Sequence, residues 1–256
     1  MHSHSEIKSN DLSSVIIQQD WKQYTPEQHE VWRTLYQRRM KDLERCASQV
    51  YLDGAQAIGL EERWVPDLER VNARLRPRTG WTAVGVPGFL PARLFFQSLA
   101  QRRFPTTITV RPADQLDYVP EPDIFHDVFG HVPLHSDPVF ADFLQAFGEL
   151  AQRAQTEDDL ERMTRLFWFT VEFGLIREHG EIKVYGSGLV SSHADCQHAM
   201  GPDCEQRRFT LQGVFEQDFG IDHIQPVLFV LESFDQLFEA VEEARRSMGK
   251  WSAPPK

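Results

Sequence analysis

The chain has 256 residues, of which 41% are hydrophobic and 25% are charged, a balance typical of soluble globular proteins. Its formal net charge is −11, which argues against nucleic acids and anionic membranes as partners, because both are bound through clustered Lys and Arg. No apolar run approaches the roughly 20 residues that span a bilayer, and no signal peptide is evident. A small-molecule ligand remains compatible with this composition.

The three cysteines show no regular spacing. Cys46, Cys196 and Cys204 are an odd, low number, so they predict no disulfide framework. Unpaired thiols fit a reducing compartment, and we therefore expect a cytoplasmic protein.

The N-terminal part of the chain divides into an arm and the start of a domain. Residues 1–22 are polar and predict a mobile N-terminal arm, with one short apolar anchor at residues 15–17. Residues 23–250 are expected to form one domain. The sequence Thr-Pro-Glu-Gln at residues 25–28 is typical of a helix start, and the apolar stripe after it predicts a long helix to about Leu52.

Helical patterns dominate the rest of the chain. Strands are predicted at residues 81–86, 106–111, 181–185 and 227–231. Helices are predicted at residues 66–75, 91–103, 137–150, 158–177, 189–200, 207–219 and 233–248. No internal repeat or long linker is present. The expected fold class is therefore mainly α with a few short β-strands in a single domain.

The segment from Pro122 to Pro133 contains two histidines five residues apart, His126 and His131. In an unbroken α-helix, five residues leave two side chains roughly 140° apart, so both imidazoles would not face one point. Gly130 is a natural helix terminator, and Val132 precedes a proline that disfavours the helical conformation. We therefore predict that the helix breaks there and that His131 swings back toward His126, as half of a metal site.

A second segment supplies a candidate third ligand. Glu172 lies in the run from Leu166 to Ile176, which is apolar except for Thr170 and Glu172. A helix with this pattern is buried, and a buried carboxylate needs a metal or a cation beside it. Two histidines and one carboxylate leave coordination positions open, as in non-haem Fe(II) oxygenases, and also suit a catalytic zinc. A structural pair between Glu172 and a buried Arg or Lys is the alternative.

Two further histidine pairs compete with this set. His131 and His135 are four residues apart, but Pro133 lies between them and disfavours a continuous helix. A zinc cluster is the second possibility, although it lacks tight Cys-x-x-Cys pairs. Its members would be His193, Asp195, Cys196, His198 and Cys204.

Several polar residues near these segments have a functional and a structural interpretation. Arg111 suits a bidentate clamp on a substrate carboxylate, or a structural pair with a neighbouring Asp. Asp123 lies one turn before His126. It either fixes the imidazole tautomer by a hydrogen bond to the ring, or stabilises the N-terminus of the helix through its negative charge. Ser191 and Ser192 either orient a ligand or cap the next helix.

At these residues the sequence resembles a known family. Pro-Asp-Ile-Phe-His-Asp-Val-Phe-Gly-His-Val-Pro (122–133) and Trp-Phe-Thr-Val-Glu-Phe-Gly-Leu (168–175) resemble the two signature segments of the aromatic amino acid hydroxylases. The chain is most similar to the short bacterial phenylalanine 4-hydroxylases, over about residues 20–240. Supporting segments lie at residues 86–89, 95–105, 116–118 and 185–192.

The resemblance implies a helical basket with a few short strands and a monooxygenase activity. Fe(II) would be bound by His126, His131 and Glu172, and a tetrahydropterin and O2 would be cosubstrates. The implied reaction is the hydroxylation of L-phenylalanine to L-tyrosine. Tyrosine or tryptophan hydroxylation is the alternative within the family, and a zinc-dependent hydrolase with the same ligands is the alternative outside it.

The resemblance also assigns roles to individual residues. The pterin would bind at Gly88, Phe89, Leu90, Phe95 and Asp127. The substrate would contact Arg111, Pro122, Trp168, Phe173, Gly188 and Ser191, and Arg111 would bind its carboxylate. Ser191 and Asp123 would support the metal ligands through hydrogen bonds.

The chain departs from other members of the family at three places. Asp127 stands where animal members have Glu, and Val119 stands where they have a threonine near the substrate. The strand at residues 106–110 lacks the aromatic residues associated with bacterial phenylalanine enzymes. No N-terminal regulatory domain and no C-terminal heptad run are present, so we expect a monomer without allosteric activation.

Overall fold

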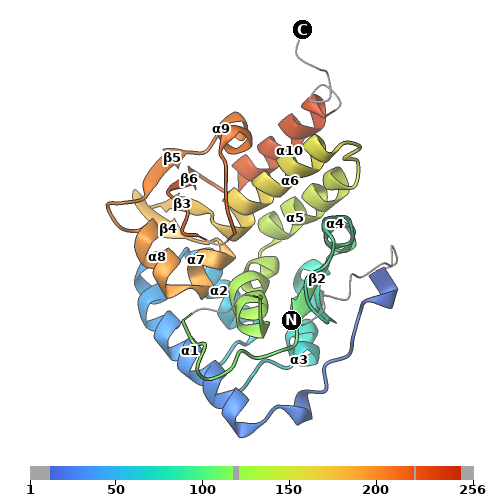
Figure 1. Ribbon diagram of the computed structural model, residues 1–256, viewed down its shortest axis with the longest axis vertical. Helices are drawn as coiled ribbons and strands as arrows, with labels where there is room; N and C mark the ends of the chain where they lie inside the picture. Colours follow the sequence, from blue (N-terminus) through green and yellow to red (C-terminus); the bar gives the residue numbers. More distant parts are fainter. Residues whose placement is uncertain (1–11, 118–120, 222, 249–256) are drawn as a thin grey trace.

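The computed structural model describes residues 12–117, 121–221 and 223–248. These residues form a mainly helical structure with short strands, which confirms the predicted fold class. Three helices lie side by side along one side of the molecule, and a four-stranded sheet lies on the other side (Figure 1). The three helices are α5 (Pro138–Ala151), α6 (Glu157–Phe167) and α10 (Asp235–Ser247).

The strands form two small sheets. In the four-stranded sheet, with the order β4-β3-β6-β5, β3 is antiparallel to β4, and β6 is parallel to both β3 and β5. The other sheet pairs β1 with β2 in parallel. The strands are β1 (Thr82–Val86), β2 (Arg103–Thr107), β3 (Leu175–Glu178), β4 (Glu181–Val184), β5 (Glu205–Arg208) and β6 (Val227–Leu231).

The predicted long helix at the N-terminus is interrupted. α1 (Pro26–Cys46) begins with the expected capping box but does not reach Leu52. Ala47 is extended because it forms a bridge with Val184 of β4. The carboxylate of Glu178 then accepts hydrogen bonds from the residues that start the next helix, α2 (Gln49–Ile58). Pairing with the sheet therefore overrides the helical pattern of the sequence.

A predicted helix is also replaced by a strand at the edge of the four-stranded sheet. The predicted helix at residues 207–219 is wrong at its start, because residues 205–208 pair with β6 as strand β5. The helix begins only at α9 (Leu211–Glu216). The remaining helices of the described residues are η1 (Leu12–Ser14), η2 (Trp21–Gln23), α3 (Leu68–Thr79), α4 (Ala92–Ala100), η3 (Phe125–His131), η4 (Val132–Ser136), η5 (Trp168–Glu172), α7 (Ser187–Ser191) and α8 (His193–Ala199).

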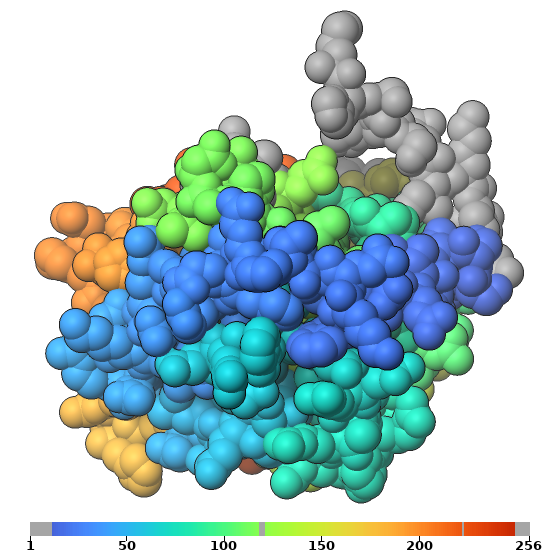
Figure 2. Space-filling model, turned by 90° about the horizontal axis from the view of Figure 1, so that it is seen from below, coloured from blue at the N-terminus to red at the C-terminus, as the bar shows by residue number. Residues whose placement is uncertain are grey.

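The N-terminal segment follows the surface of the domain from residue 12 onward. It runs with α1 as a continuous band over the segments that follow in the chain (Figure 2). Val15 is buried, and the backbone N–H of Ile17 donates to the carbonyl of Gly85 at 2.8 Å. Residues 1–11 of the expected mobile arm lie outside the described residues. Among the described residues, none of the helices combines the length and the apolar character that crossing a bilayer requires.

One hydrophobic core holds the segment that carries the two histidines. Phe125 and Phe129 stack at 4.4 Å between ring centroids, and Trp32 of α1 packs edge-on against both rings. Just beyond the C-terminal end of this segment, Gly54 of α2 packs against the backbone of Pro133. A Cβ atom at Gly54 would lie 2.2 Å from the carbonyl oxygen of Pro133, so only glycine permits this approach. The histidines are therefore fixed by close packing on two sides.

Candidate metal centre and active site

The two histidines meet because the helix widens instead of breaking. η3 is a π-helix, and η4 continues it as a 3-10 helix through Val132, whose backbone is helical. The predicted break at Gly130 is therefore wrong. A π-helix forms i→i+5 hydrogen bonds, so residues five apart lie about one turn from each other. The ring centroids of His126 and His131 are 5.1 Å apart.

A proline explains why the backbone does not continue as an α-helix. Pro133 has no N–H, so it leaves the carbonyl of Phe129 without its α-helical donor. The hydroxyl of Tyr51 supplies the missing hydrogen bond at 2.9 Å. The buried carbonyl is thus satisfied by a side chain from α2.

Glu172 reaches the same point from a second π-helix. η5 continues α6 and ends at Glu172, and strand β3 begins at Leu175. The helix predicted to extend to Arg177 is therefore shorter than expected. The Oε1 atom of Glu172 lies 3.3 Å from Nε2 of His126, and Oε2 lies 3.2 Å from Nε2 of His131. These two imidazoles and one carboxylate converge as the sequence predicts.

The donor set fits a metal ion. Ligand atoms about 2.1 Å from a cation and at right angles to each other are about 3.0 Å apart. The observed separations of 3.2 and 3.3 Å are close to this value. Within the described ranges, His126, His131 and Glu172 are the only group of three or more His, Cys, Asp or Glu residues with this geometry. Two imidazoles and one carboxylate with open positions suit Fe(II).

The carboxylate of Glu172 is buried and held in place. Burial alone would raise its pKa, but the imidazoles of His126 and His131 and the hydroxyl of Ser187 lower the pKa to about 2. Ser187 Oγ donates to Oε2 at 2.9 Å. Gly188 also packs here, since a Cβ atom would lie 3.0 Å from Oε1 of Glu172. Glu172 is therefore an ionised, oriented candidate ligand, and its contacts are with the two histidines and Ser187 rather than with a buried Arg or Lys.

The ring of His126 is oriented by Ser191, as expected. Ser191 Oγ lies 3.0 Å from Nδ1 of His126, which leaves Nε2 directed at Glu172. Asp123 does not fix the tautomer in this structure: its carboxylate accepts the backbone N–H of His126 at 3.1 Å. The helix-end interpretation of Asp123 is therefore the one that the contacts support.

Arg111 forms a buried pair with Asp123. Its Nε and Nη2 atoms donate to the two carboxylate oxygens at 2.9 and 2.8 Å, and its Nη1 donates to the carbonyl of Leu116. Burial would raise the pKa of Asp123, but the Arg111 guanidinium lowers it below the ordinary value. The structural interpretation of Arg111 is thus observed, and a contact with a substrate carboxylate remains a proposal.

Asp127, expected beside the pterin, is buried under strand β2. Its Oδ2 accepts hydrogen bonds from the backbone N–H and the hydroxyl of Thr107 at 2.6 and 2.8 Å. Burial raises the pKa of Asp127, and the neighbouring His126 opposes that shift. Asp127 therefore links η3 to the two-stranded sheet, and the role of Thr107 was not predicted from the sequence.

The residues expected at the pterin lie around the start of α4. Phe89 is 66% exposed, Gly88 has open space around its Cα, and Leu90 packs against the buried cluster of Leu12, Val15 and Leu94. The ring of Phe95 meets Phe167 edge-on at 5.2 Å, and Phe167 in turn stacks on His131 at 6.2 Å. A path of aromatic contacts therefore joins this region to the metal ligands.

An aromatic wall adjoins Glu172. Trp168 and Phe173 lie 4.8 Å apart between ring centroids, and a Cβ atom at Gly188 would lie 2.8 Å from Cζ of Phe173. Phe219 also packs on Trp168 at 4.8 Å and was not predicted, although it ends an apolar helical pattern. Pro122 is half-buried. The departure at Val119 lies outside the described residues.

The competing metal sets do not form. His193 pairs with Asp42 at 3.0 Å, and His198 Nε2 lies 3.1 Å from the carbonyl of Gln225. His135 is buried, with its Nδ1 2.8 Å from the carbonyl of His131 and its ring against Trp81. In the part of the chain that the structure describes, neither pair forms a cluster of three or more metal-binding side chains.

Comparisons with known proteins show the family of the chain. A phenylalanine-4-hydroxylase from Caulobacter vibrioides is 44% identical over 224 residues, which cover 87% of this chain and 76% of the relative. Two crystal structures of the phenylalanine hydroxylase from Chromobacterium violaceum superpose on the present fold. The structure with bound iron(III) and oxidised cofactor 7,8-dihydrobiopterin has a TM-score of 0.88 and 38% identity, and covers 96% of this chain and 90% of its own.

The second structure, with bound iron and phenylalanine, has a TM-score of 0.86 and 36% identity, and covers 96% of this chain and 91% of its own. The profile of the biopterin-dependent aromatic amino acid hydroxylases matches residues 18–251, which is most of the sequence. The chain therefore belongs to the biopterin-dependent aromatic amino acid hydroxylase family.

Proposed function

We propose that the protein is a phenylalanine 4-monooxygenase that converts L-phenylalanine to L-tyrosine with Fe(II), a tetrahydropterin and O2. The observation that carries this proposal is the convergence of His126, His131 and Glu172 on one point, in a chain that is similar to phenylalanine hydroxylases over most of its length. The fold is similar to that of relatives whose crystal structures contain iron together with the oxidised pterin or with phenylalanine.

The protein would bind iron through Nε2 of both histidines and the carboxylate of Glu172. Iron and the tetrahydropterin together supply the electrons that activate dioxygen for transfer of one oxygen atom to the aromatic ring. Ser191 and Ser187 hold two of the three ligands in place from behind. Because they fix ligand orientation before binding, little reorganisation is needed when the metal enters.

The surroundings of the ligands suit an aromatic substrate. The rings of Trp168 and Phe173 pack on each other at 4.8 Å, and the absence of a side chain at Gly188 allows Phe173 and Glu172 to pack closely against it. Arg111 is the proposed anchor for the substrate carboxylate, and its pair with Asp123 fixes the plane of the guanidinium. Closely packed aromatic side chains also exclude water, which would compete with the substrate for the oxidant.

The pterin is proposed to bind beside Gly88, Phe89 and Leu90, with Phe95 and Asp127 near it. The exposed ring of Phe89 and the open space at Gly88 leave this loop accessible. The aromatic path from Phe95 to the metal ligands supports the placement of a flat heterocycle on this side of the site.

A zinc-dependent hydrolase fits the site less well. Such an enzyme needs a general base that activates the metal-bound water. Asp127 is the acid nearest in sequence to the first ligand, but its Oδ2 is already engaged by two hydrogen bonds from Thr107. The contacts of Asp127 therefore favour a structural role over proton transfer.

We further propose that the enzyme is a cytoplasmic monomer whose catalytic domain spans residues 23–250. The three cysteines are unpaired, as a reducing compartment favours. The profile match over residues 18–251 supports the extent of the domain. Analytical ultracentrifugation of the iron-loaded protein would test the oligomeric state, and a dimer or tetramer would contradict the proposal.

The function is tested by loading the protein with Fe(II) under anaerobic conditions and then adding oxygen and a tetrahydropterin. Phenylalanine, tyrosine and tryptophan are supplied in separate reactions, and the products are separated by chromatography. We expect tyrosine from phenylalanine as the fastest reaction. Hydroxylation of none of the three, or faster hydroxylation of tyrosine or tryptophan, would contradict the proposal.

A further inference from the structure

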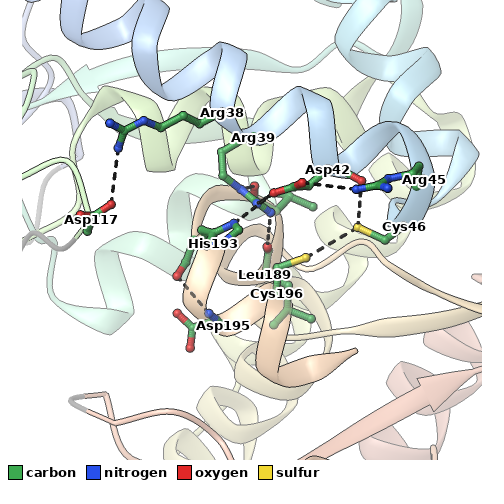
Figure 3. A network of polar contacts seen from close by, with 12 residues as sticks. Arg38, Arg39, Asp42, Arg45, Cys46, Asp117, Leu189, His193, Asp195 and Cys196 are labelled. Carbon is green, nitrogen blue, oxygen red and sulfur yellow. Dashed lines mark hydrogen bonds and ion pairs between the residues drawn. The ribbon is translucent and has the colours of Figure 1, made fainter. Parts of the chain in front are cut away.

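Two cysteines outside the proposed reaction lie next to each other. Cys46 is the last residue of α1, and Cys196 lies in α8, 150 residues further along the chain. Their sulfur atoms point toward one another (Figure 3) and are 3.7 Å apart. All three thiols are free. The third, Cys204, is buried.

The pair borders a surface pocket of about 280 Å³. Cys196 is buried and Cys46 is half-buried, so the pocket gives a small reagent a route to the sulfur atoms. The other residues that line the pocket are Arg39, Asp42, Arg45, His193, Gln197 and Met200. Two arginines and one aspartate therefore share this pocket with the two thiols.

The charges around the thiols favour a thiolate at Cys196. The hydrogen bond with Cys46 lowers the pKa of Cys196 to about 6, with burial opposing this effect and the Arg39 guanidinium adding to it. The same hydrogen bond raises the pKa of Cys46. Asp42 also opposes the thiolate, but its carboxylate is paired with His193 at 3.0 Å and with Arg39 at 3.5 Å. Electropositive surroundings of this kind are typical of reactive cysteines.

Cys204 provides an internal comparison. Burial and the neighbouring Glu205 raise the pKa of its thiol above the ordinary value. A thiol of this kind is almost entirely protonated at neutral pH and is a poor nucleophile. The chain therefore contains one activated thiol, one thiol positioned to react with it, and one inert thiol.

We propose that Cys46 and Cys196 form a dithiol site that a hydroperoxide oxidises to an intramolecular disulfide. Cys196 is the nucleophile, and Cys46 is the resolving thiol. A disulfide has an S–S distance of about 2.05 Å, so the two sulfur atoms must approach by about 1.7 Å. The site is distinct from the metal centre, and it does not depend on the proposed substrate.

The reaction balances with hydrogen peroxide as the oxidant. The thiolate of Cys196 attacks one peroxide oxygen, an S–O bond forms, the O–O bond breaks, and hydroxide leaves and takes up a proton as water. The sulfur of Cys46 then attacks the sulfenic acid, an S–S bond forms, the S–O bond breaks, and the second water leaves with the proton of Cys46. Two thiols are oxidised and one peroxide is reduced to two molecules of water.

This arrangement protects a reactive thiolate from irreversible oxidation. Without a neighbouring thiol, a sulfenic acid is oxidised further to sulfinic acid, which is not reduced by ordinary thiols. With Cys46 at 3.7 Å, the sulfenic acid of Cys196 is converted to a disulfide that a reductant reverses. An enzyme that handles dioxygen and a reduced cofactor benefits from such a site.

The first test is oxidation of the reduced, iron-loaded protein with one equivalent of hydrogen peroxide, followed by intact mass and peptide mapping. We expect the loss of two hydrogen atoms, a cross-link between the peptides of Cys46 and Cys196, and full reversal by a thiol reductant. The iron-free protein should give the same product. A cross-link that involves Cys204, or one that forms only with iron present, would overturn the proposal.

Variants separate the two roles. Cys46→Ser should stop at a sulfenic acid on Cys196 that dimedone traps and that excess peroxide converts to sulfinic acid, whereas Cys196→Ser should leave Cys46 reduced. Cys204→Ser is the matched control and should form the disulfide like the wild type. Equal rates of sulfinic acid formation at Cys196 in the wild type and in Cys46→Ser would refute a resolving role for Cys46.

Alkylation by iodoacetamide gives a readout without peroxide. The rate at Cys196 should rise with pH to half its maximum near pH 6, because only the thiolate reacts. At pH 7 the larger thiolate fraction at Cys196 outweighs its lower intrinsic nucleophilicity, so alkylation should be faster at Cys196 than at Cys204. Equal rates at the two cysteines would contradict the assignment of Cys196 as the nucleophile.

Discussion

Replacing Ser191 by Ala should weaken iron binding without unfolding the protein. The hydroxyl lies 3.0 Å from Nδ1 of His126 and is the contact that orients this ring. Loss of such a supporting group typically costs 10- to 100-fold in metal affinity, which corresponds to roughly 1.4–2.7 kcal/mol. His131 and Glu172 keep their positions, so we expect weaker binding of one iron rather than its complete loss.

The adjacent serine provides a matched control. Ser192 caps α8 by accepting the backbone N–H of Asp195 at 3.3 Å and has no assigned role at the metal. Ser192→Ala should lower the free energy of unfolding by about 1 kcal/mol and leave iron affinity unchanged. Affinities are measured by anaerobic competition with a chelator, and stabilities by urea unfolding. Unaltered iron affinity in Ser191→Ala, or equal losses in both variants, would refute the orienting role of Ser191.

Three further changes test other parts of the site. Glu172→Ala should abolish iron binding and turnover but retain the circular dichroism spectrum of the wild type; unchanged turnover would show that the third ligand is assigned wrongly. Gly188→Ala should lower stability by about 1–3 kcal/mol in thermal unfolding and also weaken iron binding, because its Cβ would crowd Phe173 and Glu172; wild-type behaviour would contradict the close contact. Arg111→Ala should cost about 3–5 kcal/mol in urea unfolding, since it leaves the buried Asp123 unpaired, and a loss within experimental error would refute this.

The ligand set was predictable from sequence because each ligand stands out against an apolar background. Glu172 is an acid in a buried helix, and His126 and His131 interrupt a largely apolar segment. Their convergence was predicted for the wrong reason, however. Gly130 and Pro133 suggested a broken helix, whereas the backbone widens into a π-helix with Tyr51 satisfying a freed carbonyl. That hydrogen bond joins residues 78 positions apart, and no local pattern encodes it.

The errors in the fold have a similar origin. The helical pattern across Ala47 was overridden by a bridge to Val184, and residues 205–208 became a strand because β6 lies beside them. Local propensity describes a segment in isolation, but these backbone groups find partners far away in the chain. The same limit applies to Thr107, whose contact with Asp127 depends on how β2 packs against η3.

The central claim is that one iron bound by His126, His131 and Glu172 supports hydroxylation of phenylalanine. Its most direct test is a titration of the metal-free enzyme with Fe(II) under anaerobic conditions, followed by measurement of tyrosine formed with oxygen and a tetrahydropterin. We predict that the rate rises in proportion to added iron and stops rising at one iron per chain. Full activity before any iron is added, or with zinc in its place, would contradict the account.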